Sequence, residues 1–473
     1  MTHEPPLNID PLVANERDDP GAAFIAAPAS RDAAPVSRPQ RLSSIDALRG
    51  IAVLGILLMN ITAFGLPYWA YVDPSVAGGS TGANLWTWIV TEMLFEGTFR
   101  TIFSMLFGAG IILLTSRLEE RRAVHPADAR GPGVAAIHYR RNVWLVVFGI
   151  IDAWVLLWTG DILYLYGLLG LLLYPLRHCR PATLIIGAVL VLAVLDSIYV
   201  WEWRETVALR EAAAEAEDAE ALGMPLSPDQ EDALNAWRDR VSEDKPSLEE
   251  LEIEKRSMQG GYLDVALALA PYNFWFETVE VVRSGLWDAG AMMLLGMALM
   301  KLGVLSAARS SRFYVIMLAL GYVVGLGVNA YETIMVARSG FSVDAMAQAT
   351  VTYDLGRLGV ALGHIGLFML LFMRGSLAGT FKRLAAVGQM ALTNYLMASV
   401  LCGLVFHGYG LSLYGELDRW QLYLVVLGVW IVQLTISPIW LRYFHFGPVE
   451  WLWRSLTYWR RQPMRRHAAQ TDE

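Results

Sequence analysis

Cysteine and charged residues are both scarce in this chain. Only two of the 473 residues are cysteine, Cys179 and Cys402, which excludes a disulfide framework and a cysteine-ligated metal site. Charged residues make up 17% of the chain and hydrophobic residues 55%, outside the usual range of soluble globular proteins. No Walker loop, Rossmann fingerprint, zinc-ligand spacing or G-x-S-x-G elbow is present. The composition predicts an integral membrane protein with no metal and no permanently bound cofactor.

Long apolar runs predict an all-α, polytopic helical bundle of about ten transmembrane helices, because a helix needs roughly 20 mostly apolar residues to cross the hydrocarbon. The runs lie at residues 45–66, 94–116, 142–159, 161–178, 182–201, 285–305, 313–336, 354–374, 384–406 and 420–441. The third and fourth runs meet at Thr159 and Gly160, which predicts a tight helical hairpin.

Basic residues gather in alternate connections between these runs. Arginines follow the second, fourth, sixth, eighth and last runs, whereas connection 67–84 has none. Because positively charged connections stay in the cytoplasm, both termini are predicted to be cytoplasmic. Residues 1–44 lack the apolar core of a cleavable signal and are predicted to form a disordered tail.

Composition divides the chain into five parts. They are a disordered cytoplasmic tail (1–44), an N-terminal membrane bundle (45–201), an acidic extracytoplasmic loop (202–276), a C-terminal membrane bundle (277–446) and a cytoplasmic interfacial tail (447–473). The acidic loop is rich in helix formers, so two or three short exposed helices are expected, broken near Pro225, Pro228 and Pro246. Tryptophan and arginine interleaved in the last part indicate an amphipathic helix at the membrane surface, not a nucleic-acid-binding segment.

The run SSIDALRGIAVLGILLMNITAFGLP, residues 43–67, carries a polar stripe. At roughly 100° per residue, one quadrant of this helix holds Asp46, Arg49, Val53, Leu57 and Asn60. Polar side chains in a spanning helix cost free energy unless they face protein or trapped water. The stripe therefore predicts that other helices surround this one.

Four motifs together resemble the YeiB-like membrane proteins, whose C-terminal half is known as domain of unknown function 418. They are SSIDALRG with NITAFGLP in the first run, WTGDILYLYGLLG at 158–170, MALTNYLMAS at 390–399 and GPVEWLWRSLTYWR at 447–460. The resemblance extends over nearly all of residues 41–460, in the family's order, and leaves out the N-terminal tail and the acidic loop. It implies a bacterial inner-membrane protein.

The YeiB-like family resembles the wider transmembrane acyltransferase group, which includes the lysosomal heparan-glucosamine N-acetyltransferase. That resemblance implies acyl-CoA as the donor and a glycan or small molecule as the acceptor across the membrane. Arg49 and Asn60 match an arginine and an asparagine of that group's first helix. Tyr71 stands where the lysosomal enzyme has a reactive histidine, so an acyl-histidine route through this position is not supported.

Three residues of the first run are candidates for chemistry. Asp46 and Arg49 are spaced to pair, and Arg49 either binds a phosphate or carboxylate of the donor or forms a structural ion pair. Asn60 lies about 16 Å further along the same face. It either positions the acyl group or acceptor, or holds helices together.

A carboxylate and two histidines are candidates for managing the proton. Asp161 precedes the fourth run and is either a helix cap or a group that deprotonates the acceptor. His364 lies mid-run behind Asp354 and Arg357 at helical spacing, either as general base or proton relay or as a packing residue. His407 is a second, weaker candidate.

Gln389 and Asn394 form a polar patch near the start of the ninth run, and either contact a donor head group or pack between helices. The leading hypothesis is acyl transfer across the bilayer, with Arg49 orienting the donor and His364 or Asp161 managing the proton. One alternative is a transporter of a small polar solute that uses Asp46, Arg49, Asp354, Arg357 and His364 as its pathway. Another is an envelope factor without catalysis.

Overall fold

The computed structural model of the chain describes residues 38–124, 132–375 and 377–466. Helices form nearly every element, and no strand occurs within these ranges. The only β-type pairing of the described residues is a single antiparallel bridge between Phe444 and Arg465. The α-helices are α1 (Arg38–Gly65), α2 (Gly82–Leu94), α3 (Thr98–Val124), α4 (Val134–Trp154), α5 (Leu163–Leu173), α6 (Pro181–Ala221), α7 (Pro228–Asp244), α8 (Leu248–Met258), α9 (Tyr262–Trp275), α10 (Leu286–Lys301), α11 (Ser311–Arg338), α12 (Val343–Arg374), α13 (Ala378–Gln389), α14 (Ala391–Phe406), α15 (Arg419–Tyr443) and α16 (Pro448–Tyr458). Two short 3-10 helices, η1 (Tyr68–Tyr71) and η3 (Tyr174–His178), and a π-helical segment, η4 (Phe276–Gly285), complete the set.

The predicted all-α membrane bundle is confirmed. Seven helices of the described chain are long and apolar enough to cross a membrane, and the pair α13 and α14 makes eight if it is one bent span. Two of the ten predicted runs correspond to shorter helices, because α5 has 11 residues and α10 has 16. The count of ten spans therefore stays a prediction.

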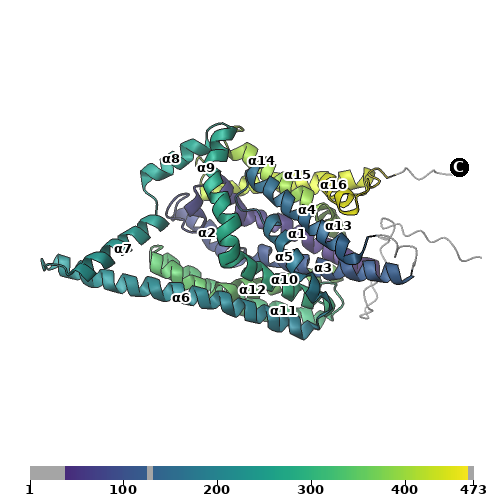
Figure 1. Cartoon of the computed structure of the whole chain (residues 1–473), viewed down its shortest axis with the longest axis horizontal. Helices are drawn as coiled ribbons and strands as arrows, with labels where there is room; N and C mark the ends of the chain where they lie inside the picture. Colours follow the sequence, from purple (N-terminus) through teal and green to yellow (C-terminus); the bar gives the residue numbers. More distant parts are fainter. Residues whose placement is uncertain (1–37, 125–131, 376, 467–473) are drawn as a thin grey trace, which may run out of the picture.

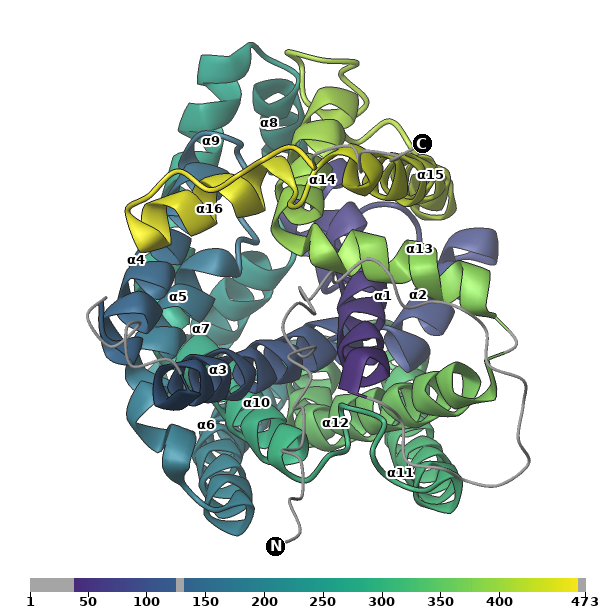
Figure 2. The ribbon, with the colours of Figure 1, turned by 90° about the vertical axis from the view of Figure 1, so that its right-hand side faces the viewer.

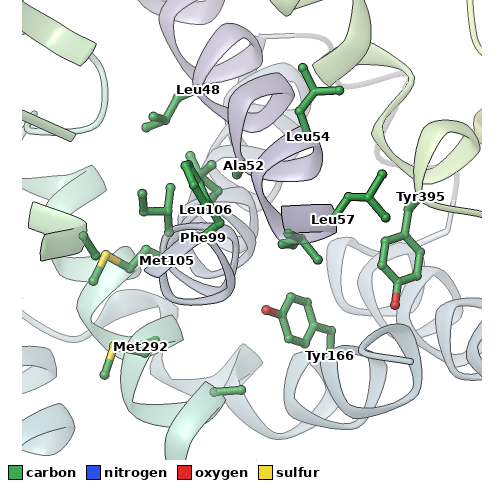
Figure 3. Packing of buried hydrophobic residues seen from close by; sticks show 14 of the residues in the cluster. Leu48, Ala52, Leu54, Leu57, Phe99, Met105, Leu106, Tyr166, Met292 and Tyr395 are labelled. Carbon is green, nitrogen blue, oxygen red and sulfur yellow. The ribbon is translucent and has the colours of Figure 1, made fainter. Parts of the chain in front are cut away.

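Helix α1 lies inside the bundle, as its polar stripe predicted. In its most apolar stretch 72% of the residues are buried, compared with 17% for α6 and 22% for α11. It is flanked by α3 and α12 on one side and by α13 and α14 on the other (Figure 2). Figure 3 shows Leu48 and Ala52 of α1 beside Phe99 and Leu106 of α3, while Leu57 points toward Tyr395 of α14.

The start of α1 differs from the sequence expectation. A disordered tail was expected up to residue 44, but the helix begins at Arg38. Pro39 then falls in the first helical turn, where its missing N–H has no partner to lose. Residues 1–37 and 467–473, the remainder of the two predicted tails, lie outside the described residues.

The two ends of the bundle differ in character (Figure 1). One end, called here the arginine-rich end, carries Arg117, Arg121, Arg141 and Arg454 at the ends of α3, α4 and α16. The opposite end, called the projecting end, carries α7 and α8. The 41-residue helix α6 runs past the predicted boundary at residue 201 into this projection, and the short helices α7 and α8 follow it after Pro225 and Pro246. Residues 211–221, EAAAEAEDAEA, are strong helix formers, and no breaker occurs before Gly223.

A sharp bend separates α13 from α14. The two helices meet at 81° around Met390, within a run that was expected to form one straight span. Helix α13 crosses α1 at two glycines whose lack of a side chain lets the backbones touch. A Cβ on Gly388 would lie 1.8 Å from the carbonyl oxygen of Asp46, and one on Gly50 would lie 2.0 Å from that of Leu384. The crossing therefore holds α13 in place against the first helix.

Replacing Gly388 with alanine is expected to lower the free energy of unfolding by about 3 kcal/mol, because the new methyl group must push two backbones apart. The measurement is unfolding in mixed micelles followed by tryptophan fluorescence. Gly110→Ala is the matched control, since Gly110 also lies in a spanning helix but a Cβ there would have nothing within 4 Å. Equal losses in the two variants would contradict the close crossing.

Candidate functional site

Two carboxylates face each other where α4 ends and α5 begins, toward the projecting end. Asp152 is 0% exposed, and neither of its oxygens has a hydrogen-bond partner. Asp161 and Ser399 are its polar neighbours. A carboxylate in such a buried place is costly, so Asp152 is a candidate for a role other than stability.

Asp161 is held by the start of α5. Its Oδ1 accepts from the backbone N–H of Leu163 at 3.1 Å, and its Oδ2 accepts from that of Tyr164 at 2.8 Å. The expected capping interaction is therefore present. Gly149 of α4 permits this arrangement, because a Cβ there would lie 2.5 Å from Asp161 Oδ2. Asp161 is thus a fixed carboxylate beside the unpartnered Asp152.

A narrow cavity adjoins this carboxylate pair. Its lining includes Asn60 and Leu57 of α1, Trp158 of the α4–α5 connection, and Tyr395 and Ser399 of α14. A volume of about 20 Å³ is open to the centre of a water-sized sphere, enough for about one water molecule. The structure therefore brings the Asn60 side of α1 and the carboxylate pair to one place.

Tyr395 connects the cavity to the carboxylates. Its phenolic oxygen accepts a hydrogen bond from Trp158 Nε1 and another from the N–H of Ile162, both at 3.2 Å. Because a phenol oxygen has two acceptor positions, its own hydrogen remains for donation. Tyr395 can therefore donate to Asp161, to Asp152 or to a bound oxyanion.

The polar stripe of α1 reaches from the arginine-rich end to this cavity. Val53 and Leu57 line the cavity with Asn60. Arg49 Nη1 donates to Asp46 Oδ1 at 3.1 Å, so the predicted pair is formed. Gln389 Nε2 donates to the other Asp46 oxygen at 3.4 Å, which joins the bend before α14 to the first helix.

Asn394, the second residue of the predicted polar patch, has a packing role instead. It is 0% exposed, and its amide group donates to the carbonyl oxygen of Val387 and to Ser437 Oγ. Gln433 Nε2 donates to its backbone carbonyl oxygen at 2.8 Å. These bonds tie α14 to α15 just past the bend.

A second polar cluster surrounds Arg357 on α12. Its Nε donates to Asp354 Oδ1 at 2.8 Å, and its Nη2 donates to Asp288 Oδ1 on α10. Arg100 on α3 forms an ion pair with the second oxygen of Asp288 at 3.3 Å. The Arg357 side chain is 2% exposed, so this is a buried ion network that joins three helices.

The network continues toward the projecting end through hydroxyl groups. Arg100 donates to the Tyr353 hydroxyl, which in turn donates to Glu96 Oε1 at 2.9 Å. Tyr71 donates to the other Glu96 oxygen at 3.1 Å. Tyr71 is therefore a hydrogen-bond donor to a carboxylate.

His364 is separated from the cavity by α1. Its Nδ1 lies 3.0 Å from the carbonyl oxygen of Val360 on its own helix, and the rings of Phe95, Phe99 and Tyr322 surround it. Phe99 packs on Gly55, which lies roughly 180° around α1 from Asp46. The structure therefore does not bring His364 together with Asn60 or Asp161.

The family can be identified from two comparisons. A family model described as "Protein of unknown function (DUF418)" matches residues 299–460. "Uncharacterized protein YeiB" from Escherichia coli K12 is 31% identical over 428 residues, covering 88% of this chain and 96% of that protein. The chain belongs to the YeiB-like family. The YeiB-like chain is also similar to "Uncharacterized protein YxaH" from Bacillus subtilis 168. The two are 27% identical over 446 residues, which cover 91% of this chain and 97% of YxaH. No solved structure matches significantly.

The motifs that indicated the YeiB-like family can now be given physical roles. Gly50 ends SSIDALRG and touches α13. Tyr395 and Ser399 of MALTNYLMAS line the cavity, and Trp158 and Asp161 of WTGD face them. Three of the four motifs thus meet at the cavity although they are far apart in sequence, the first of them through Asn60.

Three residues of this YeiB-like site, Asp152, Tyr395 and Ser399, were not predicted. Asp152 had a usable signal, since it is the only charged residue in the apolar run 142–159. Tyr395 and Ser399 had none, because hydroxyl groups occur commonly in spanning helices.

His407 follows α14 in this YeiB-like chain, and its burial predicts that the stability of the protein depends on pH. It is 2% exposed, and burial lowers its pKa from 6.5 to about 4. As the pH falls, His407 takes up a proton in the unfolded state at a higher pH than in the folded state. The free energy of unfolding therefore has its full value above pH 6.5 and declines as the pH falls toward 4. The loss at pH 4 is expected to be about 3 kcal/mol. Unfolding of wild type and His407→Gln at pH 7.5 and 4.5 measures it, and an equal pH response in both would contradict the assignment.

Proposed function

We propose that this protein transfers an acyl group across the bacterial inner membrane, from a cytoplasmic acyl-CoA to a hydroxyl group of a glycan or small molecule on the outer side. The arginine-rich end is taken as cytoplasmic, following the distribution of basic residues. The observation that carries the proposal is that the α1 stripe runs from Arg49 to a cavity beside the buried Asp152 and Asp161.

Each group along this path has a chemical role in the proposal. Arg49 orients the donor through charge-assisted hydrogen bonds. The Asn60 amide donates to the acyl carbonyl oxygen as negative charge develops there. Asp152, beside Ser399, accepts the proton of the acceptor hydroxyl, while Asp161 stays fixed by the backbone of α5.

In the proposed step, the acceptor oxygen bonds to the thioester carbonyl carbon, its proton passes to Asp152, and the carbon–sulfur bond breaks. The sulfur leaves as thiolate and takes up a proton as free CoA. Because the cavity holds about one water molecule, Leu57 and its neighbours must move for an acyl group to enter.

The test uses the full chain in nanodiscs with acyl-CoAs of several lengths. We expect thermal stabilisation by an acyl-CoA and release of free CoA, with both weakened at least tenfold in Arg49→Ala. Arg312→Ala is the matched control, because Arg312 is an exposed arginine at the same end. Absence of binding by any acyl-CoA to the folded protein would overturn the proposal and favour transport of a small polar solute.

A further inference from the structure

The C-terminal helix α16 packs across the arginine-rich end instead of lying on the membrane surface alone. Trp453 is 8% exposed, and its Nε1 donates to the backbone carbonyl oxygen of Arg141 on α4 at 2.8 Å. Figure 2 shows α16 crossing in front of α4 and α14 at this end. The contact fixes two arginines, Arg141 and Arg454, on facing elements.

Both arginines lie on aromatic rings. The guanidinium carbon of Arg141 is 3.7 Å from the centre of the Trp453 ring, and that of Arg454 is 4.4 Å from the Phe446 ring. A ring attracts a cation through its face but leaves the charge whole and the N–H groups at the edge free. An arginine held in this way is prepared to bind an anion.

No acid neutralises these two arginines within the described chain. No carboxylate oxygen there lies within 4 Å of either guanidinium, and the buried Nε of Arg454 has no hydrogen-bond partner. The neighbouring acids are already engaged: Glu450 accepts from the N–H and the hydroxyl of Thr393 at 2.9 and 2.5 Å, and Asp46 holds Arg49.

Most of the charged groups that act on these two arginines are positive, and Glu450 is the acid that acts on Arg141. Arg454 and Arg49 both act on Arg141, and Arg121 acts on Arg454. Burial lowers the pKa of Arg454, and the positive charge of Arg121 lowers it further. Residues that merely anchor the chain at a membrane surface are exposed, as Arg460 is. The repulsion between packed arginines would be relieved by a multiply charged anion.

We infer that Arg141 and Arg454, together with Arg49, bind the phosphate groups of an anionic ligand at the arginine-rich end. The guanidinium fork matches the geometry of phosphate oxygens. The ligand is either a soluble phosphate compound or a phospholipid head group, since both present the same chemistry. Its identity as the phosphate part of an acyl donor rests on the proposed function.

The first experiment measures binding of inorganic pyrophosphate to the full chain in phosphatidylcholine nanodiscs by thermal stabilisation at constant ionic strength. We expect Arg141→Gln and Arg454→Gln each to weaken binding at least tenfold, and Arg454→Lys to weaken it less. Arg460→Gln, with the same change of charge at the end of the same helix, is expected to bind as wild type does. Unfolding without ligand checks that each variant is folded.

A second arm replaces phosphatidylcholine with phosphatidylglycerol. If phosphatidylglycerol stabilises wild type more than Arg454→Gln and displaces pyrophosphate, the site holds a lipid head group. The inference is overturned if neither ligand binds, or if Arg460→Gln weakens binding as much as the other glutamine variants. The pyrophosphate experiment contains no acyl compound, so its result does not depend on the proposed function. If pyrophosphate binds but the separate acyl-CoA experiment shows no turnover, the proposed function is removed and the phosphate site stands.

Discussion

Replacing Arg357 with glutamine is expected to lower the free energy of unfolding by about 3 to 5 kcal/mol. The substitution leaves Asp354 charged and buried without its ion-pair partner, and it leaves Asp288 paired with Arg100 alone. The side chains of Asp288 and Asp354 are 12% and 6% exposed, so water cannot replace the lost guanidinium. The measurement is unfolding in mixed micelles at pH 7.5. Adding Asp354→Asn to the variant is expected to recover part of the loss, because it removes the charge that the variant leaves unpaired.

Arg283→Gln is the matched control for this prediction. Arg283 also bonds an acid on another helix, Glu202, but its side chain is 48% exposed. Its loss is expected to cost no more than about 1 kcal/mol. If Arg357→Gln is as mild as this control, the network around Arg357 does not hold α3, α10 and α12 together.

Replacing Asp152 with asparagine is expected to separate function from stability. Asparagine has nearly the same shape and can keep polar contact with Ser399 and Asp161, so the stability is expected to change by no more than about 1 kcal/mol. Acyl transfer is expected to fall by a factor of about 10² to 10⁴, the usual contribution of a general base. Unfolding and CoA release are measured on the same preparation.

Two further variants make the Asp152 result specific. Asp218→Asn removes an exposed carboxylate from α6 and is expected to change neither quantity. Asp161→Asn weakens the hydrogen bonds to the start of α5, so it is expected to lower stability as well as turnover. Full turnover in Asp152→Asn would remove this carboxylate from the mechanism.

The sequence predicted the membrane bundle and the central first helix because both depend on local pattern. A run of apolar residues is visible without knowing its neighbours, and so are Asp46, Arg49 and Asn60 within it. The partners of such groups are not visible in the same way. Asp288 and Arg100 meet Arg357 only because α10, α3 and α12 pack together.

The bend at Met390 shows a second limit of local pattern. Residues 384–406 are mostly apolar, and nothing in their order requires two helices. The bend depends on groups far away in sequence: α13 is held by the backbone of α1 through Gly388, and the start of α14 is held by Glu450. Such long-range contacts decide the geometry of the site.

The contact between Glu450 and Thr393 also constrains how the protein is made. Helix α14 leaves the ribosome well before α16, so its first turn exists for a time without the carboxylate that later accepts from the Thr393 N–H. A chain that stops short of residue 450 would leave this N–H without its carboxylate. The start of α14 therefore gains its acceptor only after α16 has been made.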